Sequence, residues 1–179
     1  MARDAATQGY AEALFQIAQA EGALDAVENE LFDFARTIER EPQLRQALTD
    51  PALPNERKQA LLNELLGERA NPHTTRLLGF VVEQGRARDL ASIVDELVRL
   101  AAERRNSVVA EVRTAVPLDD ERRRRLEGAL GRATGRRVEL KTVVDPSVVG
   151  GVVARVGDQV IDGSVRRRLE LARERLSEV

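Results

Sequence analysis

Hydrophobic side chains recur every three or four residues through most of residues 1–105. One such stretch places its apolar residues on a single helical face: Leu24, Val27, Leu31, Phe34 and Ile38. Five further stretches repeat this period, and Asn71-Pro72 is typical of a helix start, with Asn as the cap and Pro at the first helical position. Short helices cannot each bury an apolar face alone. The pattern therefore predicts an N-terminal six-helix bundle over residues 1–105.

The pattern changes near Asn106, where apolar and polar residues begin to alternate as in a strand. The alternation predicts strands at 108–116, 138–144, 152–156 and 159–161, the last two joined by a tight turn at Gly157-Asp158. A helix is predicted from Asp119 or Asp120 to about residue 133, and a last helix after Asp162-Gly163-Ser164. Residues 106–179 are thus expected to form a small α/β domain, a mixed sheet with two helices, which makes the whole chain α+β.

Composition removes much catalytic chemistry from this chain of 179 residues. It has no cysteine and one histidine, His73, which excludes disulfides, thiol nucleophiles and sites built from several histidines. Residues 1–105 carry 13 Lys and Arg against 18 Asp and Glu, and residues 106–179 carry 15 against 12. Opposite net charges suit a protein that contacts two different partners, although on charge alone two unevenly charged solvated surfaces are the better explanation.

No apolar stretch approaches the roughly 18 residues of a membrane span, and the N-terminus lacks a hydrophobic signal core. We therefore expect a cytoplasmic protein that meets a membrane only through a partner. Gly150-Gly151 is followed by strand-forming residues rather than by a helix, which argues against a phosphate-binding loop. An enzyme with an unrecognised site stays an alternative for which no substrate can be named.

Two arginine runs, 122–125 and 166–168, are the only basic clusters. They could contact nucleic-acid phosphates, so a nucleic-acid-binding adaptor is the second interpretation of the sequence. Acidic residues lie close by, and aromatic residues make up 3% of the chain, which leaves few platforms for base stacking. A solvated face, or a docking face for an acidic protein, accounts for the runs better.

Three stretches resemble the delta subunit of bacterial F-type ATP synthase, the counterpart of the mitochondrial oligomycin sensitivity-conferring protein. They are Tyr10–Ala18, Leu77–Leu90, and the most specific one, Val144–Asp158 with Ile161-Asp162-Gly163-Ser164-Val165 after it. The resemblance implies a non-catalytic peripheral-stalk subunit without cofactor or metal, held on the cytoplasmic face of the cell membrane by its complex. It implies that the helical domain binds the N-terminal helix of an alpha subunit and that the small domain binds the C-termini of the b subunits, with no nucleic acid.

The resemblance also supplies candidate residues, and it puts the alpha-subunit helix in a groove between the first and fifth helices. The candidates for that groove, some of which must also form bundle core, are Tyr10, Ala11, Leu14, Phe15, Leu78, Val81 and Val82. The family signature, for which we expect a structural role in bending the sheet backbone and capping the last helix, comprises Gly150, Gly151, Asp162 and Ser164. The candidates for contact with the stalk are Arg122, Arg123, Arg124, Arg125, Arg166, Arg167 and Arg168.

Overall fold

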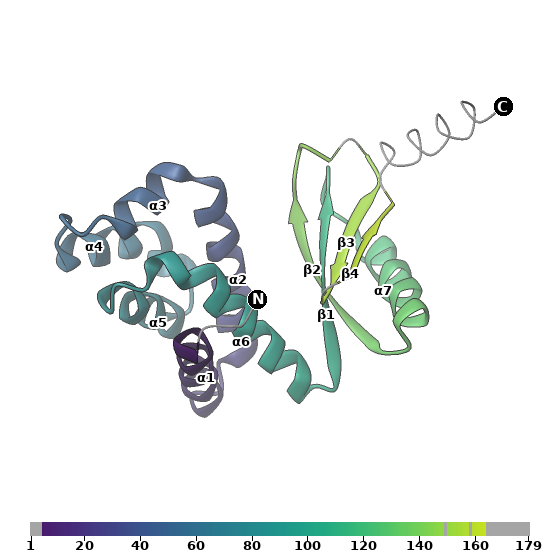
Figure 1. The fold of residues 1–179 in the computed structure, drawn as a ribbon, viewed down its shortest axis with the longest axis horizontal. Helices are drawn as coiled ribbons and strands as arrows, with labels where there is room; N and C mark the ends of the chain where they lie inside the picture. Colours follow the sequence, from purple (N-terminus) through teal and green to yellow (C-terminus); the bar gives the residue numbers. More distant parts are fainter. Residues whose placement is uncertain (1–4, 149, 158, 164–179) are drawn as a thin grey trace. The chain divides into compact units, whose positions relative to one another are not determined.

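The computed structural model describes residues 5–148, 150–157 and 159–163, and the chain divides into two compact units, Met1–Ala101 and Ala102–Val179. This division lies four residues before the domain boundary that the sequence pattern predicts, inside the last turn of a helix. The architecture is α+β (Figure 1). The second helix predicted for the smaller domain falls on residues 164–179, outside the described residues.

Six α-helices make up the described part of the first unit. They are α1 (Ala5–Ala20), α2 (Leu24–Arg40), α3 (Pro42–Thr49), α4 (Asn55–Leu66), α5 (Pro72–Glu83) and α6 (Leu90–Arg104), with short 3₁₀ turns η1 (Gly67–Arg69) and η2 (Ala87–Asp89). Leucines at the predicted inward positions are fully buried, including Leu14, Leu31, Leu62, Leu78 and Leu97. Within the described ranges, no helix is both long enough and apolar enough to cross a membrane.

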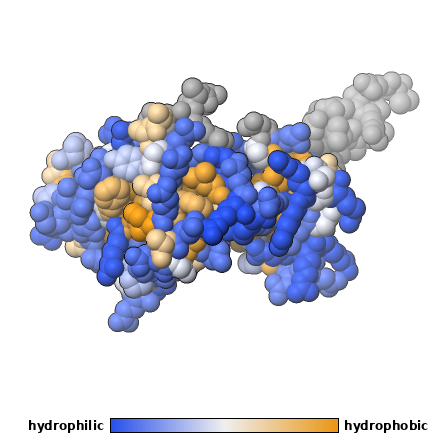
Figure 2. Space-filling view, turned by 90° about the horizontal axis from the view of Figure 1, so that it is seen from below, coloured by the Kyte–Doolittle hydropathy of each residue, from blue (hydrophilic) through white to orange (hydrophobic). Residues whose placement is uncertain are grey.

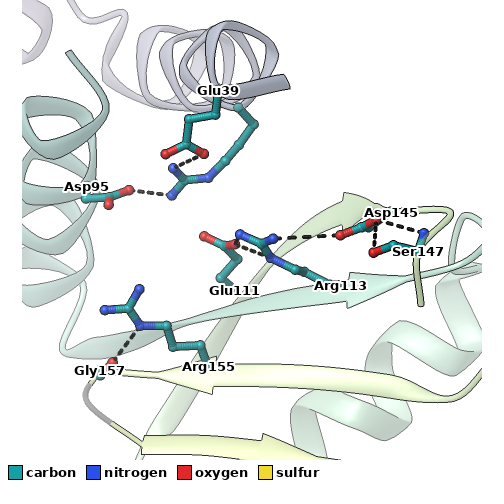
Figure 3. A network of polar contacts seen from close by, with 9 residues as sticks. Glu39, Asp95, Glu111, Arg113, Asp145, Ser147, Arg155 and Gly157 are labelled. Atoms are coloured by element: carbon teal, nitrogen blue, oxygen red, sulfur yellow. Dashed lines mark hydrogen bonds and ion pairs between the residues drawn. The ribbon is translucent and has the colours of Figure 1, made fainter. Parts of the chain in front are cut away.

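Two polar joints fix α2 against its neighbours. Glu30 of α2 accepts hydrogen bonds from the Asn71 backbone N–H at 2.9 Å and from the buried Thr74 hydroxyl at 2.5 Å. These bonds join α2 to the first turn of α5, where Asn71 is the N-cap predicted from the sequence. Arg36 of α2 pairs with Asp95 of α6 at 2.5 Å and also with Glu39 of its own helix. Figure 3 labels the two acidic partners.

The second unit is a four-stranded mixed sheet in the order β2-β1-β3-β4. Its strands are β1 (Ser107–Thr114), β2 (Arg137–Val144), β3 (Val152–Val156) and β4 (Gln159–Asp162). β1 runs parallel to β2 and antiparallel to β3, and β3 and β4 form the predicted hairpin. β1 ends two residues earlier than the alternation predicts, and the Thr114 hydroxyl donates to the Val116 carbonyl just after it.

Helix α7 (Asp120–Thr134) packs on one face of this sheet (Figure 1). Asp119 caps its start, where the Asp119 carboxylate accepts from the Arg122 backbone N–H, and Gly135 caps its end in the left-handed conformation. Alternate residues of three strands point at Leu130 of the helix and form the core of the unit: Ala110, Val112, Val138, Leu140 and Ala154. The strand period and the capping residues thus account for this half of the fold.

Candidate partner-binding site

Helices α1 and α5 lie side by side in the first unit, and two contacts fix their direction. At one end, the rings of Tyr10 and Phe80 are 6.0 Å apart between centroids. At the other, His73 Nε2 lies 3.9 Å from an oxygen of Glu21, just beyond the end of α1. Since the residue numbers rise along one helix as they fall along the other, the two helices are antiparallel.

Apolar side chains remain on the surface where these helices meet. Ile17 of α1 is 44% exposed and Phe80 of α5 is 41% exposed, although both are large and hydrophobic. Tyr10 and Ala13 are half-buried and precede Ile17 by about two turns and one turn, so the three lie on the same side of α1. We call this surface, formed by Tyr10, Ala13, Ile17 and Phe80, the α1–α5 seam. Figure 2 shows apolar side chains gathered among polar ones on the helical unit.

Charged groups stand at the border of the seam. The Arg86 guanidinium lies 5.8 Å from the centre of the Tyr10 ring and pairs with Asp89 at 3.1 Å. The hydrogen bond with Asp89 raises the pKa of Arg86, so the guanidinium keeps its positive charge. Arg76, one turn before Phe80 on α5, is exposed and has no ion-pair partner among residues 5–148, 150–157 and 159–163.

The residues predicted for the groove lie at two depths. Ala11, Leu14, Leu78, Val81 and Val82 are at most 1% exposed, so they form the core beneath the seam. Tyr10 lies in the seam itself, whereas Phe15 is half-buried on the other flank of α1. Sequence reasoning did not select Ile17 and Phe80. The sequence feature that could have identified Ile17 is the apolar arc of α1, which is wider than one inward face requires.

The signature stretch around Asp145 ties a loop to the sheet, as Figure 3 shows. The Asp145 carboxylate accepts from the backbone N–H of Ser147 at 2.9 Å and from its hydroxyl at 2.7 Å, which makes a tight local turn. Its other oxygen lies 3.7 Å from Arg113 of β1, which also pairs with Glu111 at 3.1 Å. The Asp145 N–H donates to the Thr114 carbonyl at 2.8 Å. These contacts hold the chain between β2 and β3.

Gly150 and Gly151 end this loop with φ angles of 73° and 80°, a region that residues with a side chain rarely adopt. They lie just before β3 rather than within the sheet. Asp162 is the last residue of β4, where it pairs with Val153, and Ser164 lies outside the described residues. The expected capping of a last helix therefore stays a prediction.

The arginine run of α7 is largely neutralised by its own helix. Arg122 lies 3.3 Å from Asp119, Arg123 lies 3.5 Å from Glu127, and Arg125 pairs with Glu121. Arg123 also donates to the Leu140 carbonyl. Arg124 is exposed and, among the residues that the structure describes, has no ion-pair partner.

The second arginine run, Arg166, Arg167 and Arg168, falls outside the described ranges. Within those ranges, no three His, Cys, Asp or Glu side chains are grouped so that they could hold a metal ion.

Comparison with known proteins shows the family. Residues 6–176 match the family model described as ATP synthase delta (OSCP) subunit. The chain belongs to this family. It is 50% identical over 165 residues to the ATP synthase subunit delta of Frankia alni, an alignment that covers 92% of this chain and 60% of the relative. The subunit delta of Desulforamulus reducens is 41% identical over 177 residues, with 98% and 97% covered.

This delta-family chain thus spans about 60% of the length of several curated relatives and nearly the full length of another. Among solved structures, a chain of the Toxoplasma gondii mitochondrial ATP synthase hexamer matches with a TM-score of 0.59 and 25% identity, covering 97% of this chain and 98% of that one. A chain of the Polytomella F-ATP synthase matches 59% of this chain with a TM-score of 0.51 and shows likeness of fold alone. The nucleic-acid interpretation of the arginine runs finds no support in these matches.

Proposed function

We propose that this chain is a non-catalytic subunit of the peripheral stalk of an F-type ATP synthase. The observation that carries the proposal is the match of nearly the whole chain to the delta (OSCP) family. A stator must keep the catalytic head from turning with the rotor, so its linking subunit needs affinity and stiffness rather than reactive side chains. Buried helix faces and paired charges between helices supply that stiffness.

The first unit binds the N-terminal helix of an alpha subunit on the α1–α5 seam. Ile17 and Phe80 offer apolar area to such a helix, and burying it yields roughly 25 cal/mol per Å² before the costs of association. The sides of α1 and α5 have no free backbone hydrogen-bonding groups, because these bond within each helix. A partner that lies there must satisfy its own backbone, which an amphipathic helix does.

The second unit contacts the C-termini of the b subunits, and the two units thus serve as an alpha-binding and a b-binding domain. Surface charge supports this assignment, since Arg124 is exposed on α7. The protein meets the cytoplasmic face of the cell membrane only through the complex. It requires no cofactor of its own.

Reconstitution tests the proposal. ATP synthase from the same organism, stripped of its delta subunit and placed in proton-tight vesicles, hydrolyses ATP without efficient proton pumping. Adding the purified chain should restore ATP-driven acidification of the vesicles at one chain per head. If the chain neither binds the stripped enzyme nor restores acidification, it is not the stator link.

A further inference from the structure

The border of the α1–α5 seam carries a charge that an apolar contact alone does not explain. Arg76 lies one turn before Phe80 on α5, is exposed, and has no ion-pair partner in the described part of the chain. His73, one turn earlier still, pairs with Glu21, and Arg86 at the other end pairs with Asp89. Both basic side chains that flank Arg76 along this stripe therefore have an acidic neighbour, whereas Arg76 has no ion-pair partner among the described residues.

A helix that covers Phe80 must also come close to Arg76, since the two side chains are one turn apart on the same side of α5. Removing water from a guanidinium without giving it an anion is costly. For an apolar helix, the cost of removing water from Arg76 would therefore offset part of the binding free energy gained by covering Phe80. A helix with a carboxylate at the matching position would form a charge-assisted hydrogen bond instead, and a guanidinium can bind a carboxylate through two parallel bonds.

We infer that Arg76 selects an amphipathic helix that carries an Asp or Glu one turn from the apolar side chain seated on Phe80. This inference rests on the proposed binding of a helix to the α1–α5 seam and adds the chemistry of that helix. Because a single ion pair at one end of an apolar contact is directional, Arg76 also sets the direction in which the helix lies. Its role is specificity, and the apolar residues of the seam supply most of the affinity.

The test uses the full chain and a synthetic peptide with the N-terminal sequence of the alpha subunit from the same organism. Each acidic residue of the peptide is changed in turn to Gln and to Lys, and binding is measured by calorimetry at low salt. One such Gln change should weaken binding to the wild type roughly three- to tenfold and should have no effect on binding to Arg76→Gln. The corresponding Lys peptide should bind Arg76→Glu better than it binds the wild type.

Arg45→Glu is the matched control, since Arg45 is an exposed arginine of α3 in the same unit and the change in net charge is equal. It should leave the preference among the peptides as it is in the wild type. Equal binding of every peptide to wild type and Arg76→Gln overturns the inference while leaving helix binding intact. Absence of binding by any peptide to the folded chain overturns helix binding on the seam and the inference with it.

Discussion

Replacing either of two glycines, one within α7 and one directly after it, should change stability in opposite directions. Gly128 lies within α7, where an added Cβ would meet only Arg132 at an ordinary 3.5 Å. Gly135 follows the helix with a φ of +68°, which strains any residue with a side chain. We expect Gly128→Ala to raise the free energy of unfolding by about 0.5–1 kcal/mol and Gly135→Ala to lower it by about 1 kcal/mol. Urea unfolding at pH 7 measures both, and a change of the same sign in the two variants would contradict this explanation.

Glu139 of β2 gives stability that depends on pH. Partial burial by itself raises the pKa of Glu139, but hydrogen bonds from Arg105 and Ser107, with the charges of Arg105 and Lys141, outweigh it and leave the pKa below its ordinary value. The folded state therefore favours the carboxylate, and the stabilisation is present above about pH 4.5 and lost as the pH falls further.

Replacing Glu139 by Gln should lower the free energy of unfolding at pH 7 by about 1 kcal/mol. It should also flatten the loss of stability between about pH 5 and about pH 3. Denaturant unfolding across this range measures both effects, with Glu64→Gln on the exposed surface of α4 as the control. An unchanged slope in Glu139→Gln would show that the carboxylate does not titrate with folding.

At the scale of elements, the joint between α2 and α5 is the feature that sequence reasoning could not find. The Asn71-Pro72 helix start was predicted and is confirmed, because capping depends on neighbours in the chain. Glu30 also bonds that helix start, yet it lies 41 residues from Asn71 in sequence. Local patterns contain no information about such a pair. The same holds for Arg36 and Asp95, which bring α2 and α6 together.

Removing the Glu30 side chain should loosen this joint. Glu30→Ala leaves the Asn71 N–H and the buried Thr74 hydroxyl without their acceptor, and it removes a negative charge from the start of α5. We expect a loss of about 2–3 kcal/mol in the free energy of unfolding, measured by thermal and urea denaturation. Glu64→Ala should change stability by less than about 0.5 kcal/mol. Equal effects of the two substitutions would contradict the assigned role of Glu30.

At the scale of the whole molecule, three features could be predicted from the sequence: the α+β class, the succession of helices and strands along the chain, and the family. Period-3.6 and period-2 patterns report which residues face a core, and Leu14, Leu78 and Val81 do so. The same patterns do not separate a core face from a surface that awaits a partner, because both are apolar. Five of the seven groove candidates therefore lie in the core, and Ile17 and Phe80 emerged only from their exposure.

The central claim is that a helix binds across the α1–α5 seam, and calorimetric titration of the full chain with the alpha-subunit N-terminal peptide tests it most directly. The wild type should form a 1:1 complex, and Ile17→Ser and Phe80→Ser should each weaken it by about five- to tenfold through loss of buried apolar area. Leu65→Ser is the matched control, because Leu65 of α4 is likewise 41% exposed but lies outside the seam. The claim would be contradicted if Leu65→Ser weakened binding as much as Ile17→Ser and Phe80→Ser do, or if none of the three substitutions affected binding.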